Sequence, residues 1–225
     1  MHLDKKVKIC ELFEPKTPYL QPLFERAEYP WEILPRINGY IKELFENPPP
    51  GFIQVKPGVL AGKNVKISPL ATVEPPAVLG DGTELRPGAY IRGNVITGAN
   101  CTIGNSCELK NCVLLEHASV PHYNYVGDSV LGVGAHMGAG AICSNLKADG
   151  KDVVVHGERE YATGLRKVGA VLGDGAEVGC GCVLNPGTVV GKRTRVYPLT
   201  SLRGVTGEDM IVKSDGNSVK RRAEK

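Results

Sequence analysis

The segment VPHYNYVGDS, residues 120–129, is richer in polar and aromatic side chains than the sequence on either side of it. Within this segment His122 stands next to Tyr123, with Tyr125 two residues further on. An imidazole titrates near neutral pH, so a histidine in such a setting can act as a general base. The competing interpretation is a surface histidine at a turn.

Cationic side chains occur within the same part of the sequence. Arg86 and Lys110 lie upstream of His122 and can hold a phosphate or a carboxylate group. Several other polar residues have no evident place in the repeat described next, namely Tyr123, Asn124, Tyr125, His136, Asn145 and Lys151.

These residues are set in a six-residue repeat that runs from Val55 to Leu114. An aliphatic residue opens each hexad, as in LGDGTE and LRPGAY, and a small residue follows four positions later. This period is typical of a triangular β-helix, in which each hexad forms one side and three hexads form one turn. We therefore predict an all-β, single-stranded parallel β-helix, whose turns are stabilised by stacking on one another.

The hexads return from Leu131 to about Ala148 and from Leu172 to about Ser201. Between the tracts we expect the register to slip around Pro121–Val126, and we expect a loop or β-hairpin to leave the solenoid over about 149–169.

The first 50 residues differ from the rest and have helical spacing, as in WEILPRINGYIKELFEN. We predict three parts: a helical N-terminal cap over residues 1–50 that covers the open end of the solenoid, the β-helix over 51–205, and a C-terminal tail over 206–225. The basic end of the tail, VKRRAEK, is expected to be a solvated segment, with clamping of a phosphate-bearing ligand as the alternative.

Composition limits the class of protein. The formal net charge of +3 is too small to indicate a nucleic-acid partner, and no apolar run approaches the ~18 residues of a membrane span. No secretory apolar region follows the first residues. Cys101, Cys107 and Cys182 occupy small inward positions of the repeat, which favours a reducing cytoplasm. Cys180 and Cys182 form a C-x-C without a second pair, so no metal is expected.

Five segments carry a more specific resemblance: LRPGAY (85–90), NSCELKN (105–111), VPHYNYVGDS (120–129), MGAGAICSNL (137–146) and TGLRKVGAVLGDG (163–175). Over residues 55–205 the chain resembles the C-terminal domain of the bifunctional glucosamine-1-phosphate acetyltransferase/N-acetylglucosamine-1-phosphate uridyltransferases, most closely the archaeal-type sugar-1-phosphate nucleotidyltransferases. The resemblance implies a left-handed β-helix, a homotrimer with sites between subunits, and transfer of acetyl from acetyl-CoA to an amino-sugar 1-phosphate.

The resemblance also implies roles for single residues. His122 would be the general base, and Tyr125 would contact the sugar. The remaining substrate-side residues would be Arg86, Lys110, His136 and Lys151, and those on the acetyl-CoA side would be Ala139, Asn145 and Cys180.

The chain departs from the family pattern at several positions. His136 stands where the bacterial enzyme has Asn, Leu146 replaces Tyr, and Cys180 stands where Ser is expected. We expect no nucleotidyltransferase half in this sequence: GDGTELRP (80–87) imitates its phosphate loop but lies wholly within the hexads.

Two other functions stay open. The chain could be a non-catalytic trimeric β-helix related to UDP-N-acetylglucosamine pyrophosphorylases that binds a sugar phosphate or a nucleotide sugar. Alternatively His117 and His122 have the H-x4-H spacing of zinc ligands in γ-class carbonic anhydrases, although no third histidine lies between His2 and His117.

Overall fold

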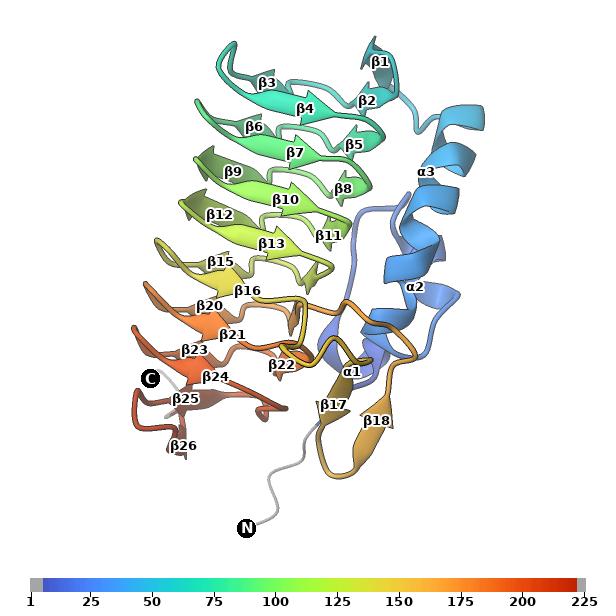
Figure 1. Cartoon of the computed structure of the whole chain (residues 1–225). Helices are drawn as coiled ribbons and strands as arrows, with labels where there is room; N and C mark the ends of the chain where they lie inside the picture. The colour runs from blue at the N-terminus through green and yellow to red at the C-terminus, as the bar shows by residue number, and fades with distance from the viewer. Residues whose placement is uncertain (1–5, 222–225) are drawn as a thin grey trace.

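A computed structural model describes residues 6–221 of the chain as a parallel β-solenoid with a helical segment along its side (Figure 1). Three sheets form the faces of the solenoid, and the chain visits them in the order A, B, C in each turn. Sheet A contains β1 (Ile53–Lys56), β2 (Val59–Ala61), β5 (Ala77–Leu79), β8 (Val95–Thr97), β11 (Cys112–Leu114), β14 (Val130–Leu131), β19 (Ala170–Leu172) and β22 (Thr188–Val190).

Sheets B and C complete the triangle. Sheet B contains β3 (Lys66–Ile67), β6 (Glu84–Leu85), β9 (Thr102–Asn105), β12 (Ser119–His122), β15 (His136–Met137), β20 (Glu177–Val178), β23 (Arg195–Val196), β25 (Met210–Val212) and β26 (Ser218–Lys220). Sheet C contains β4 (Thr72–Glu74), β7 (Tyr90–Arg92), β10 (Glu108–Lys110), β13 (Tyr125–Gly127), β16 (Ile142–Cys143), β21 (Val183–Leu184) and β24 (Ser201–Leu202). The predicted all-β parallel solenoid is confirmed.

The interior of the solenoid is filled by the first and fifth residues of the hexads, as predicted. Nearly all first positions are buried, because each one points to the axis from the middle of a side. Val55 and Ile67 are the exceptions, with 46% and 38% exposure. Both lie at the N-terminal end of the solenoid, and Val55 belongs to β1, which pairs antiparallel with β2 instead of forming a side.

The six-residue repeat loses its phase at two places, and neither is the place predicted from the sequence. Ile91 pairs with Leu109, eighteen residues on, but Val95 pairs with Cys112, only seventeen residues on. One residue is therefore missing between β10 and β11, so Cys112 points inward and Val113 packs outward against the helical segment. A second residue is missing between β13 and β14, whereas the hexads continue unbroken through Pro121–Val126. The predicted slip at Pro121–Val126 is therefore wrong.

The helical segment lies along the outer face of sheet A and does not cover the open end of the solenoid, contrary to the prediction (Figure 1). Outward residues of sheet A, such as Val78, Ile96 and Val113, are fully buried beneath it. Its elements are α1 (Ile9–Leu12), α2 (Gln21–Glu25), the 3-10 turns η1 (Pro30–Glu32) and η2 (Leu34–Arg36), and α3 (Ile37–Glu46).

The longest helix, α3, buries Ile37, Tyr40, Ile41 and Leu44, which recur at helical spacing on one face. The segment WEILPRINGYIKELFEN, which has helical spacing, is not one continuous helix. It begins with the 3-10 turns η1 and η2 and continues as α3, and Pro35 within η2 has no amide N–H to donate.

The predicted excursion is a β-hairpin of β17 (Val154–His156) and β18 (Glu160–Ala162). It folds back onto the helical segment: Tyr161 contacts the stacked rings of Tyr29 and Trp31, and Val153 and Val155 are buried there.

The chain does not end in a tail at residue 206. β25 continues sheet B beside β23, and β26 returns antiparallel to β25. Met210 and Val212 are buried, so this segment closes the C-terminal end of the interior. Of the basic end, residues 222–225 lie outside the described part of the chain.

Candidate functional site

His122 ends β12 and lies exposed at the corner between sheets B and C. The chain turns here at Tyr123, whose φ of +52° lies in the left-handed region. The backbone N–H of His122 donates to Oδ1 of Asn124 at 3.1 Å. Asn124 is only 2% exposed, and its Nδ2 donates to the carbonyl oxygens of Gly138 (2.8 Å) and Ala141 (3.1 Å). The amide of Asn124 thus ties the turn that carries His122 to the next turn.

Ala139 and Cys180 occupy the same corner on the two turns that follow His122. Their strands, β15 and β20, stack in register after β12, so the three residues are spaced by about 4.8 Å per turn. The neighbouring residues at this corner are glycines, and a Cβ on Gly138 would lie 2.6 Å from the backbone N of Cys180. Backbone thus packs directly on backbone here, and the two turns that follow His122 present only small side chains at this corner.

Arg86 lies at the same B–C corner, two turns before His122. Its Nε is 3.1 Å from Oε2 of Glu84, and both side chains are about 40% exposed. The guanidinium therefore keeps donors available to a ligand at this corner.

A second group of predicted residues lies on sheet C and at the corner between sheets C and A. Tyr125 is half-buried at the start of β13, and its hydroxyl accepts a hydrogen bond from Nδ2 of Asn145 at 3.2 Å. Burial raises the pKa of Tyr125 above its ordinary value. Lys110 ends β10, one turn before Gly127 of β13.

A buried carboxylate organises this second corner. Asp128, 6% exposed, accepts hydrogen bonds from Nδ2 of Asn111 (2.9 Å) and from Nδ2 of Asn145 (2.5 Å). The three residues lie on consecutive turns; the six-residue period loses a residue at the corners of Asn111 and Asp128, and the excursion begins after Asn145. Neither Asp128 nor Asn124 was assigned a role from the sequence, although Asn124 stood out as a polar residue that the repeat did not explain.

The remaining two predicted residues lie elsewhere. His136 is exposed on the outer face of sheet B, between Ser119 and Glu177. Lys151 is exposed in the excursion before β17. Within one chain, therefore, Arg86, His122, Ala139 and Cys180 share the B–C corner, while Lys110 and Asn145 lie at the far edge of sheet C. Tyr125 begins the strand between the two edges, and its hydroxyl meets Asn145. The B–C corner and the C–A corner are about 16 Å apart, since about five extended residues of sheet C separate them.

A single chain does not bring together the ligands of the zinc-site interpretation. His117 precedes β12 and His122 ends it, so the two imidazoles lie at opposite ends of one strand. Within residues 6–221 no group of three or more histidine, cysteine, aspartate or glutamate side chains is placed to hold a metal ion. No helix in the same range is both long and apolar enough to cross a membrane.

Comparison with known proteins identifies relatives of the solenoid. Residues 73–160 match the family described as the GMPPB C-terminal domain. The "Bifunctional protein GlmU" of Methanococcus maripaludis is 36% identical over 49% of this chain and 27% of its own length. The "Bifunctional sugar-1-phosphate nucleotidylyltransferase/acetyltransferase" of Sulfurisphaera tokodaii is 33% identical over 60% of this chain and 37% of its own length. The chain thus spans well under half of either relative.

Solved structures give weaker likenesses. PerB of Caulobacter crescentus, solved with CoA and GDP-perosamine, has a TM-score of 0.41 and 19% identity over 66% of this chain and 53% of its own. AntD, an N-acyltransferase from Bacillus cereus, has a TM-score of 0.44 and 15% identity over 77% of this chain and 90% of its own. These likenesses are too weak to transfer any property to this chain. In its sequence matches and its hexad solenoid, the chain is similar to the hexapeptide-repeat C-terminal domain of the bifunctional GlmU proteins.

Proposed function

We propose that this chain is an acyltransferase that transfers the acetyl group of acetyl-CoA to the amine of an amino-sugar 1-phosphate such as glucosamine 1-phosphate. The observation that carries the proposal is the exposed His122 at a corner whose next two turns present only small side chains. The relative from Sulfurisphaera tokodaii also supports the proposal, since its name includes an acetyltransferase.

His122 serves as the general base in this proposal. The neutral amine attacks the carbonyl carbon of the thioester, and its nitrogen loses one proton as the new bond forms. A neutral imidazole accepts that proton near neutral pH. The amine nitrogen forms a bond to the acetyl carbon while the carbon–sulfur bond breaks. The products are an amide and the thiol of CoA, and the imidazolium returns its proton to the departing thiolate. Asn124 keeps the backbone of His122 in place through its hydrogen bonds.

We assign acetyl-CoA to the ridge of small residues that follows His122. Ala139 and Cys180 leave a narrow strip along the B–C corner, where an extended pantetheine arm fits without a bulky side chain in its way. The resemblance adds Asn145 to this side.

We assign the sugar phosphate to Arg86, Lys110, Tyr125, His136 and Lys151. Guanidinium and ammonium groups bind phosphate through charge-assisted hydrogen bonds. Because these residues lie at both edges of sheet C and on other faces, one chain does not gather them into one pocket. We therefore propose a homotrimer in which the edge of one copy completes the corner of the next. The seven cysteines are free, which fits our placement of the protein in a reducing cytoplasm.

Thiol release from acetyl-CoA in the presence of glucosamine 1-phosphate tests the proposal. We expect wild-type protein to release CoA and to form the N-acetylated sugar phosphate, identified by mass spectrometry. His122→Asn should lower the rate by at least about 100-fold, because a general base contributes that much or more.

His156→Asn is the matched control, since His156 is also an exposed histidine but lies on the excursion hairpin. It should keep the wild-type rate. If the protein binds glucosamine 1-phosphate but releases no thiol, it is a non-catalytic binding protein and the proposal is wrong. Equal activity in His122→Asn and wild type would reject His122 as the base.

A further inference from the structure

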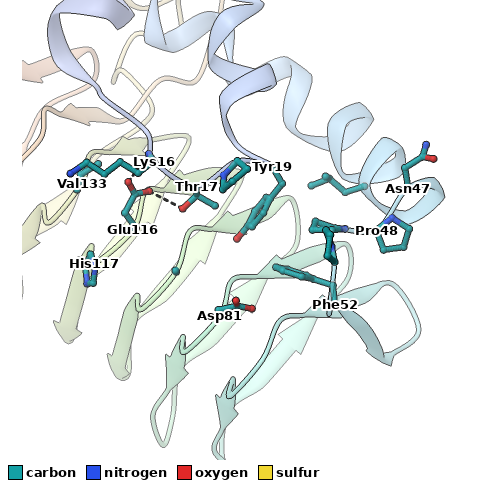
Figure 2. A pocket seen from close by; sticks show the side chains of 15 residues that line it. Lys16, Thr17, Tyr19, Asn47, Pro48, Phe52, Asp81, Glu116, His117 and Val133 are labelled. Atoms are coloured by element: carbon teal, nitrogen blue, oxygen red, sulfur yellow. Dashed lines mark hydrogen bonds between the residues drawn. The ribbon is translucent and has the colours of Figure 1, made fainter.

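A cavity of about 750 Å³ lies between the helical segment and the corner that joins sheets A and B (Figure 2). One wall is the strap, residues 16–19, which crosses the solenoid between α1 and α2. The opposite wall is formed by corners of four successive turns, at Asp81, Ala99, His117 and Val133. Residues 47–50, which follow α3, and Phe52 close one end.

Hydrogen bonds hold the strap over this cavity. Glu116, 6% exposed, accepts hydrogen bonds from the backbone N–H of Lys16 (2.7 Å) and from the hydroxyl of Thr17 (2.9 Å). The hydroxyl of Tyr19 donates to the carbonyl oxygen of Thr97 at 2.7 Å. The cavity therefore has ordered walls in the isolated chain and needs no partner to form it.

One end of the cavity combines two aromatic rings with a carboxylate. The rings of Tyr19 and Phe52 lie 5.1 Å apart at 72°, so they form two walls of a corner. Asp81 lies beside these rings, as Gly62 shows. A Cβ on Gly62 would lie 2.1 Å from Oδ1 of Asp81 and 3.0 Å from Cε2 of Phe52. The glycine at position 62 is thus required for this approach of carboxylate and ring.

The carboxylate of Asp81 is available to a ligand. Its Oδ1 accepts a hydrogen bond from the backbone N–H of Lys63 at 2.7 Å, whereas Oδ2 has no hydrogen-bond partner among residues 6–221. In the same range no lysine, arginine or histidine forms an ion pair with it. Lys16 lies at the opposite end of the cavity, beside Val133 (Figure 2).

Negatively charged groups act on the aromatic end of the cavity. The pKa of Tyr19 is raised mainly by burial, with further contributions that include the negative charges of Asp81 and Glu116. A carboxylate beside two aromatic faces attracts positive charge, because ring quadrupoles and the carboxylate act in the same direction.

We propose that this cavity binds a small organic cation, with its ammonium or quaternary ammonium group between Asp81 and the rings of Tyr19 and Phe52. The apolar part of such a ligand would lie against Leu44 and residues 48–50, which line the same end. The site is separate from the proposed catalytic corner, because it lies at the A–B corner and His122 lies at the B–C corner.

Titrations followed by NMR chemical shifts test this site with choline and its neutral isostere 3,3-dimethyl-1-butanol. We expect wild-type protein to bind choline and to bind the neutral alcohol much more weakly. Asp81→Asn keeps the acceptor for Lys63 but removes the charge, and it should weaken choline binding by about fivefold, the scale of a solvent-exposed charge pair. Phe52→Leu should also weaken choline binding while leaving an apolar wall.

Asp215→Asn is the matched control, since Asp215 likewise accepts a backbone hydrogen bond, from Asn217 at 2.9 Å, but lies on the C-terminal hairpin. It should bind choline as the wild type does, and thermal unfolding should show that every variant is folded. The proposal is overturned if choline and the alcohol bind equally, if folded Asp81→Asn binds choline as tightly as wild type, or if phenyl phosphate binds here and choline does not.

Discussion

At the residue scale, buried polar side chains supply the hydrogen-bond partners that the hexad repeat does not provide at the corners. The hexads specify an interior of aliphatic and small residues, but corners leave backbone and side-chain polar groups that need partners. Asn124 and Asp128 supply these partners beside the candidate site. We infer that they hold the two corners rigid, so that His122 and Tyr125 are presented in one orientation.

Replacing Asp128 tests this role. Asp128→Ala removes the acceptor of the Asn111 amide and one of the two acceptors of the Asn145 amide, so we expect the free energy of unfolding in urea to fall by about 2 kcal/mol. Asp152→Ala is the control, because Asp152 is exposed and its side chain makes no hydrogen bond among the described residues. Its effect should stay within about 0.5 kcal/mol. Equal stability of the two variants would show that the Asp128 network contributes nothing.

At the scale of elements, the excursion hairpin is joined to the helical segment by aromatic contacts. The centroid of Tyr161 lies 5.7 Å from that of Tyr29 and 6.1 Å from that of Trp31. The segment that departs from the hexads therefore docks on the segment that precedes them.

We expect Tyr161→Ala to release the hairpin. Loss of two aromatic contacts, each about 0.5–1.5 kcal/mol, should raise the rate of trypsin cleavage within the excursion by about tenfold. Arg159, Arg166 and Lys167 are the cleavage positions to monitor by mass spectrometry. Tyr161→Phe keeps the ring and should be cleaved as slowly as wild type. Unchanged cleavage of Tyr161→Ala would mean that other contacts hold the hairpin.

The end of the solenoid carries an ion pair with a defined pH dependence. Nε and Nη2 of Arg193 lie 2.7 and 2.6 Å from the two carboxylate oxygens of Asp209, and hydrogen bonding to Arg193 lowers the pKa of Asp209 below its usual value. Asp209 therefore binds a proton more readily in the unfolded state than in the folded state. The ion pair stabilises the fold above the pKa that Asp209 has in the unfolded state, and this stabilisation is lost as the pH falls through its pKa in the folded state.

Asp209→Asn should therefore reduce the difference in unfolding free energy between pH 6 and pH 3. We expect a reduction of only about 0.5 kcal/mol, because the side chains of Arg193 and Asp209 are 49% and 42% exposed and water screens the pair. Urea unfolding at both pH values measures it, and Arg193→Gln should have the same effect. If both variants keep the wild-type difference, the pair does not contribute to acid sensitivity.

For the whole molecule, the helical segment determines which faces are free. It covers sheet A, so sheets B and C form the open sides of the solenoid. Apolar side chains are exposed on sheet C and at the B–C corner, with Tyr123 at 65%, Ile142 at 39%, Val183 at 37% and Leu199 at 79%. An apolar surface beside the candidate site fits the proposed contact between copies.

The double variant Ile142→Lys/Val183→Lys tests the trimer. Charges on this face should prevent association, so light scattering should give a trimer for wild type and a monomer for the variant, with loss of thiol release. Ile53→Lys/Val55→Lys is the control, because those residues are 65% and 46% exposed on β1 at the end of the solenoid. A monomeric wild type, or a monomeric variant that keeps its activity, would contradict the shared site.

The sequence by itself determined the interior of the solenoid and the segments that leave it. A hexad repeat is a local pattern: each first residue must fit the same space as its neighbour one turn away, so the rows from Val73 to Leu109 and from Leu172 to Val196 could be assigned without a structure. The departure at 149–169 was visible for the same reason, since the pattern stops there.

Only the tertiary structure decided where the other parts lie. The apolar face of α3 requires a partner but does not specify which one, so its position along sheet A could not be predicted. The two missing residues lie in corners, where polar residues tolerate either length, and the hexads alone did not locate them. Because the corners absorb the missing residues, the same inward rows continue beyond them, as the fully buried Val120 and Leu131 show.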